Sequence, residues 1–170
     1  MTVYGLGRHF DIVPATIPTA DVEAAITATR VHMRNYGGVA VVGYFGAVSA
    51  GTDVLTMDIQ QADAATGGNV KDLDAVTQYY YKTEATLDGD EAWVRGTQSA
   101  ASEIALPSTN QVLIVAEIDV DALDIANGYE WIFVTHADPG SGGTRTGSYL
   151  YIPYGLKVQR RPDLLVEPLT

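Results

Sequence analysis

The sequence contains no cysteine among its 170 residues. Disulfide bonds and thiolate metal sites are therefore excluded, while the redox compartment is left open. Positive charge is also scarce, because 10 Lys and Arg stand against 21 Asp and Glu, which gives a net charge of −11. Nucleic-acid binding depends on Lys and Arg that neutralise phosphates, so we expect no nucleic-acid partner.

Long apolar runs are missing as well. No stretch approaches the roughly 20 apolar residues of a membrane-spanning helix, so no membrane partner is expected. The opening residues MTVYGLGRHF lack the apolar core of a signal peptide. We therefore expect a protein that is made in the cytoplasm. Charged residues amount to 18% of the chain, below the usual quarter, so uncharged polar side chains must cover much of the surface.

The pattern that is present is that of β-structure. Residues 112–116 form a continuous apolar run, typical of a central strand, and residues 129–136 alternate with a period of two. We expect these two strands, joined by a polar turn, to form the centre of the fold. Six further segments are strand-like: 30–34, 39–48, 53–61, 78–84, 91–98 and 148–152. About eight antiparallel strands separated by turns predict an all-β protein, a β-sandwich or jelly roll.

Two segments rich in proline and glycine flank the predicted body at residues 30–152. Residues 1–29 are predicted to form an N-terminal arm, with a short helix over 21–29, and residues 153–170 a C-terminal arm. Both segments carry large apolar side chains, which a disordered tail normally lacks. Each arm is therefore expected to lie along a protein surface, either its own or that of a neighbour.

No segment completes a catalytic or metal-binding motif. The D-x-D-x-x-D pattern of Asp119, Asp121 and Asp124 lacks the Gly and Glu of a calcium loop, and favours a turn. A carboxylate cluster could support glycoside cleavage, although a solvated hairpin tip explains it better: Glu84, Asp88, Asp90 and Glu91. The three histidines lack zinc spacing: His9, His32 and His136. We predict no catalytic residue, no cofactor and no metal, and hence no enzyme.

Aromatic side chains on strands are the more informative feature, because exposed Tyr and Trp mark protein interfaces or sugar-binding platforms. The arms add apolar side chains of their own. The residues predicted to form an interface are Tyr4, Leu6, Phe10, Ile12, Trp93, Trp131, Tyr154, Leu164 and Leu165. A carbohydrate-binding β-sandwich is the alternative from a different functional class, and a glycan-cleaving enzyme is the least favoured.

A series of short motifs along the body resembles small virion structural proteins of tailed bacteriophages, of the capsid cement or decoration type. The motifs include V-V-x-x-F-G-A-V-S-A-G-T, Y-Y-Y-K-T-E, D-G-D-x-x-W and I-V-x-E-I-D-V-D-x-L-D. They occupy Val41–Thr52, Thr56–Ala62, Tyr79–Glu84, Asp88–Trp93, Ile114–Asp124, Asn127–Ile132 and Asp138–Gly140. Unmatched gaps separate them.

The resemblance implies a β-sandwich body whose extended termini lie across the capsid shell. It also implies that the partners are the major capsid protein and copies of the chain itself, in a homo-oligomer such as a trimer. The expected location is the outer surface of the capsid, after assembly in the host cytoplasm. A tail or head–tail connector component is the alternative role within the same particle.

Because no complete ligand set is present, calcium should not contribute to folding. Thermal unfolding curves recorded with calcium and with a chelator are expected to superimpose. A rise of several degrees in the melting temperature with calcium would contradict this prediction, and would make the turn at 119–124 a metal site.

Overall fold

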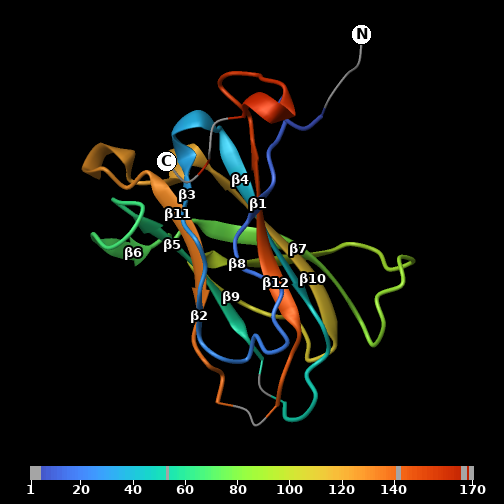
Figure 1. Ribbon diagram of the computed structural model, residues 1–170. Coiled ribbons are helices and arrows are strands. Elements are labelled where there is room, and N and C mark those ends of the chain that lie inside the picture. Colours follow the sequence, from blue (N-terminus) through green and yellow to red (C-terminus); the bar gives the residue numbers. More distant parts are fainter. Residues whose placement is uncertain (1–4, 53, 141–142, 166–167, 169–170) are drawn as a thin grey trace.

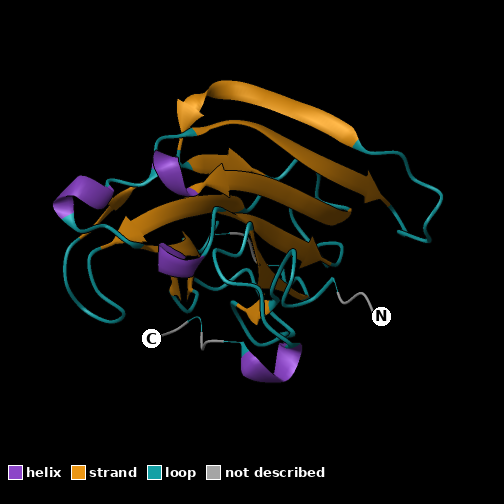
Figure 2. Ribbon diagram, turned by 90° about the horizontal axis from the view of Figure 1, so that it is seen from above, coloured by secondary structure: helices purple, strands orange, loops and turns teal. Residues whose placement is uncertain are grey.

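The fold is a sandwich of two antiparallel sheets, each with six strands (Figures 1 and 2). The computed structural model describes residues 5–52, 54–140, 143–165 and 168. Sheet A has the order β1 (Val13–Pro14), β12 (Gly147–Tyr154), β4 (Gly38–Phe45), β10 (Gln111–Asp119), β7 (Val76–Glu84) and β8 (Val94–Ala101). The prediction of an all-β sandwich is confirmed.

Sheet B is assembled around two central strands. Its order is β2 (Ile26–Thr27), β11 (Trp131–His136), β5 (Thr56–Ala62) and β6 (Val70–Asp72), with β3 (Val31–His32) beside β11 and β9 (Glu103–Ala105) beside β5. The helical elements are short 3-10 turns: η1 (Met33–Asn35), η2 (Val120–Ala122), η3 (Ile125–Asn127) and η4 (Pro162–Leu164). Within the described ranges, none of these could cross a membrane.

Each of the eight predicted strands corresponds to a strand of the structure, although 30–34 shortens to β3. The strands β1, β2, β6 and β9 were not predicted, because two or three residues are too few to show a period. The segment 111–136 does contain two strands, but they do not lie side by side. Strand β10 is in the middle of sheet A and β11 in the middle of sheet B, so the connection at 120–130 passes between the layers.

The short helix predicted over 21–29 is wrong. The chain bends at residues 23–24, and Ile26 and Thr27 then form β2 by pairing with His136 and Thr135. β-Branched Ile and Thr favour the extended conformation, and the pairing with β11 satisfies their backbone. The described part of the N-terminal segment, residues 5–29, lies along its own body (blue in Figure 1), where Val13 pairs with Tyr151 of β12.

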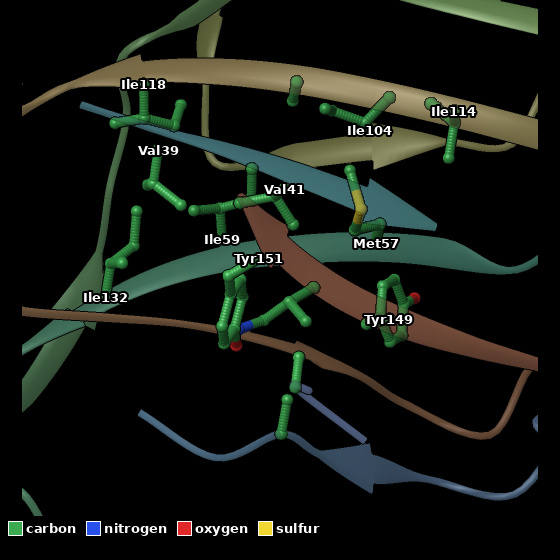
Figure 3. Packing of buried hydrophobic residues seen from close by; sticks show 14 of the residues in the cluster. Val39, Val41, Met57, Ile59, Ile104, Ile114, Ile118, Ile132, Tyr149 and Tyr151 are labelled. Atoms are coloured by element: carbon green, nitrogen blue, oxygen red, sulfur yellow. The ribbon is translucent and has the colours of Figure 1, made fainter. Parts of the chain in front are cut away.

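The core is formed by alternate residues of the facing strands. Val39 and Val41 of β4, with Ile114 of β10, point inward from sheet A and are fully buried. Met57 and Ile59 of β5 meet them from sheet B (Figure 3). Burying each such side chain contributes about 1.5–3 kcal/mol, so this layer is the main source of stability.

Two tyrosines of β12 add polar links between the sheets. The Val134 N–H of β11 donates a hydrogen bond of 3.0 Å to the hydroxyl of Tyr151. The hydroxyl of Tyr149 lies 3.0 Å from Nδ1 of His136, also on β11. Burial raises the pKa of both tyrosine hydroxyls far above the ordinary value, so they stay protonated. Both links join sheet A directly to the centre of sheet B.

Replacing Tyr151 with Phe should lower the free energy of unfolding by about 1–3 kcal/mol, because the buried Val134 N–H loses its acceptor. For a chain of this length, that corresponds to a fall of roughly 2–12 °C in the melting temperature. Tyr44→Phe is the matched control, since the Tyr44 side chain is 53% exposed. If both variants had the same melting temperature as the parent protein, the hydrogen bond between Tyr151 and Val134 would have no stabilising role.

Candidate functional site

The outer face of sheet A carries a cluster of apolar and aromatic side chains that the core does not use. We define the platform as Val42 and Tyr44 of β4, Leu113 and Val115 of β10, Leu150 of β12, Tyr80 of β7, and Trp93 beside β8. Alternation explains its position, because Val41 and Ile114 point into the core and their neighbours must point outward.

The strand register places the platform residues in rows across the sheet. Leu150 is opposite Val42, Val42 is opposite Val115, and Val115 is opposite Tyr80. Tyr44 is opposite Leu113 in the next row. Tyr44 and Trp93 are about half exposed, at 53% and 51%, and Leu150 is 37% exposed. The platform is thus a continuous apolar surface across the middle of the sheet.

The β7–β8 hairpin borders the platform and extends away from the body (yellow-green in Figure 1). The Leu87 N–H donates a hydrogen bond of 3.0 Å to Oε1 of Gln111, which ties the hairpin to β10. A shallow hollow of about 480 Å³ lies between Leu87, Asp88 and Glu91 of the hairpin and the platform residues of β4, β10 and β12. The Nζ atom of Lys82 lies 5.2 Å from the centre of the Trp93 ring.

Carboxylates gather at the same hairpin. Within the described ranges, one set of possible metal-ligand atoms comes within 4.8 Å of one another, and it comprises Glu84, Asp90 and Glu91. These are three of the four residues considered for glycoside cleavage, and they lie on the surface. The neighbouring Asp88 N–H donates a hydrogen bond of 2.7 Å to Oε1 of Glu91. A solvated hairpin tip accounts for this arrangement.

The three aspartates considered for calcium do not converge. Asp124 accepts hydrogen bonds from Nζ of Lys71 and from Nδ2 of Asn127. These partners hold the pKa of the Asp124 carboxyl below its usual range, the Lys71 contact being the largest cause. Asp119 ends β10, and Asp121 lies in η2. Asp124 therefore links the turn between the sheets to Lys71 of β6.

A buried polar cluster lies at one end of the sandwich, and the sequence pattern did not reveal it. Nε of Arg145 is 3.4 Å from Oε1 of Glu23, and both side chains are almost fully buried. His136 is nearby on β11, with Nε2 at 2.7 Å from the Val22 carbonyl and 3.1 Å from that of Ala24. Because carbonyl oxygens only accept, Nε2 carries the proton, and Nδ1 of the neutral ring accepts from Tyr149.

The predicted interface residues are scattered over the molecule. Ile12, Trp93 and Leu164 are about half exposed, and Trp93 is the one among them that belongs to the platform. Four more are partly buried: Leu6, Phe10, Tyr154 and Leu165. Tyr4 lies outside the described residues. The Tyr154 ring covers Gly38 on the neighbouring strand.

Trp131 is 8% exposed, because its own chain covers it. Its ring stacks on His32 with 4.3 Å between centroids, and Arg30 lies 4.9 Å from the centre of the neighbouring Phe133 ring. The sequence correctly placed Trp131 and Phe133 on one face of β11, but the structure leaves little of that face to a partner. Tyr44, Leu113 and Leu150 of the platform were missed, because alternation alone does not show which face is covered.

Comparisons with known proteins give one distant likeness. No protein-family profile matches the chain, and no curated protein matches it in sequence. A solved structure, that of SPBc2 prophage-derived protein YomS, is similar with a TM-score of 0.41 and 7% sequence identity. The alignment covers 85% of this chain and 91% of that chain. At these values the likeness identifies neither a family nor a function, and the capsid cement role stays a prediction.

The buried His136 should make the fold sensitive to acid. Burial lowers its pKa below the ordinary 6.5, so below about pH 6.5 the unfolded chain takes up a proton that the folded chain refuses. Above pH 6.5, the protonation of His136 should not affect the free energy of unfolding. As the pH decreases below 6.5, the free energy of unfolding should decrease. His136→Gln should reduce the loss of melting temperature between pH 7.5 and 5.5, whereas the exposed His9→Gln should not. Equal losses in both variants would contradict the prediction.

Proposed function

We propose that this chain is a non-enzymatic structural protein of a phage virion, a capsid cement or decoration protein that stabilises the head by bridging capsid subunits. The observation that carries the proposal is the platform. An outer sheet face rich in Tyr, Trp, Leu and Val is what protein interfaces use at their centres. The resemblance of the body to tailed-phage virion proteins supplies the kind of partner.

The mechanism is burial of apolar surface. Each platform side chain that a capsid subunit covers would contribute on the order of 1–3 kcal/mol before the cost of association. Trp93 and Tyr44 offer the largest exposed rings, and Leu150 adds an aliphatic contact on the far side of the hollow. A rigid sheet holds these groups in place, so little conformational entropy is lost on binding.

The charge of the chain fits a place on the outer surface of the capsid. A net charge of −11 would be repelled by the packaged DNA inside the capsid. On the outer surface, the protein faces the medium, where this repulsion is absent. The apolar platform would face the major capsid protein, while the acidic hairpin stays in water at its edge. A tail or connector component would use the same surface, and only its place on the particle would differ.

A carbohydrate-binding module is the second candidate. It is favoured by the exposed Trp93 ring, which lies beside Tyr80, Val115 and Glu117 in a second shallow hollow of about 340 Å³. An aromatic ring next to a carboxylate can stack on a sugar and accept its hydroxyl hydrogens. The Lys82 ammonium, however, lies 5.2 Å from the centre of that ring and competes for this surface.

Binding to phage heads tests the proposal. Purified protein should co-sediment with heads that lack it, and Trp93→Ala or Leu150→Glu should weaken binding roughly tenfold or more, as loss of a central apolar anchor does. Ile17→Glu is the control, because Ile17 is 85% exposed and lies outside the platform.

The outcomes separate the candidates. Platform variants that bind heads like the parent protein would overturn the role of the platform. Binding to tails but not to heads would favour the connector or tail role. Binding to a glycan that Trp93→Ala abolishes, with no binding to any part of the particle, would favour the carbohydrate-binding module.

A further inference from the structure

Three segments that are far apart in the sequence meet at one end of the sandwich: residues 5–10, 33–37 and 154–165 (top of Figure 1). The Arg160 N–H donates a hydrogen bond of 2.9 Å to the Gly7 carbonyl. Gly7 has φ +79°, and a side chain there would collide with the Arg160 carbonyl oxygen, so glycine allows this close approach. The Lys157 N–H donates a hydrogen bond of 3.0 Å to the Asn35 carbonyl. These backbone contacts join the three segments into one surface.

Half of the positively charged residues of the chain lie on this surface. We define the basic end as Arg8, Arg34, Lys157, Arg160 and Arg161. Asp163 is the one acidic residue on the same three segments, whereas the rest of the chain carries five Lys and Arg against 20 Asp and Glu. The basic end is therefore a cationic surface on a molecule that is anionic elsewhere.

The charges of the basic end are available to a partner. Four of its residues are exposed, and Arg8 is half-buried. Nζ of Lys157 donates a hydrogen bond of 2.8 Å to the Arg34 carbonyl, which leaves the Arg34 guanidinium unused. Within the described ranges, Arg161 is the one member with an ion-pair partner, Asp163 at 2.8 Å, and both of those side chains are about two-thirds exposed. An exposed pair of this kind contributes little free energy and is readily replaced by a contact with another carboxylate.

Exposed aliphatic side chains lie among these charges. Val158 is 57% exposed and Leu164 is 54% exposed, and both belong to the C-terminal segment of the basic end. Arginine beside apolar groups is typical of protein interfaces, where the apolar groups fill the contact and each guanidinium binds a carboxylate in a planar, two-bond geometry. The composition of this surface therefore favours a protein as its partner.

A nucleic acid fits the basic end less well. Gly38 is opposite Tyr154 on one side and opposite Asp119 on the other, so Asp119 lies close to the point where the C-terminal segment leaves β12. A nucleic-acid strand would continue from the basic end over this acidic surface, and its phosphates would be repelled there. A short acidic segment of a protein can end at the basic end.

We propose that the basic end binds an acidic segment of another protein, one in which several carboxylates alternate with apolar side chains. The guanidinium groups of Arg34 and Arg160 bind the carboxylates, and Val158 and Leu164 pack against the apolar side chains. The rest of the chain repels such a segment, so charge directs it to this end of the molecule. The basic end and the platform share no residue, and this contact does not rest on the proposed function.

Fluorescence anisotropy with a labelled peptide tests the binding. The probe repeats the unit Glu-Glu-Leu, and a control peptide repeats Gln-Gln-Leu. The parent protein should bind the probe more tightly than the control, and added salt should weaken this binding because it screens exposed charges. Arg34→Glu and Arg160→Glu should each weaken it by roughly five- to tenfold, since each replaces an attraction by a repulsion. The matched control is Arg95→Glu, an exposed position on β8 at the other edge of sheet A, which should bind like the parent.

Four results would overturn the proposal, provided that circular dichroism shows each variant to be folded. They are no binding of the probe, equal weakening in all three variants, equal binding of the control peptide, and a DNA duplex that displaces the probe. A parent protein that exceeds the 18.1 kDa of one chain by light scattering, and that Arg160→Glu reduces to one chain, would identify a second copy as the occupant and would overturn it too. Since no phage particle enters these assays, a failure to bind phage heads would overturn the proposed function alone.

Discussion

The hydroxyl groups of Tyr149 and Tyr151 fix how the two sheets lie on one another. Each crosses an otherwise apolar core from β12 and meets a polar group of β11, the Val134 N–H in one case and the His136 ring in the other. Apolar contacts stabilise the core without a preferred direction. The two hydrogen bonds add direction, because shifting one sheet would leave the buried donor without its acceptor at a cost of about 1–3 kcal/mol.

That alignment also determines which surface is left for partners. With β12 held over β11, sheet B covers the inner side of the first strands of sheet A and reaches β7 and β8 only in part. Tyr79 and Tyr81 are accordingly half-buried, and Val94 of β8 is 45% exposed. Among the described residues, none forms a layer on the opposite face of sheet A, so the platform and the edge strand β8 are neighbours on one side of the molecule.

Much of the fold could be predicted from the sequence, because alternation with a period of two and continuous apolar runs are local signals of long strands. The alternation over 129–136 identified β11, and the apolar run at 112–116 identified β10. The pairing of strands could not be predicted, since Val13 meets Tyr151 and Glu23 meets Arg145 only through the tertiary fold. For the site, alternation showed two faces of β4 and β10, but which face sheet B covers depends on distant segments. Trp93 was predicted because exposed Tyr and Trp side chains often mark interfaces, whereas Tyr44 and Leu150 were not predicted.

The pairing of β1 with β12 has a consequence for the order of events in the cell. Val13 leaves the ribosome long before its strand partner Tyr151 is made. The pair of β1 and β12 therefore cannot form until Tyr151 has been made, and strands that pair over such separations form slowly. Throughout this interval β8 is already synthesised and its edge is accessible. During this interval, the open edges of two incomplete chains can pair with each other. The order of synthesis, as well as the final contacts, therefore affects the fraction of chains that fold correctly.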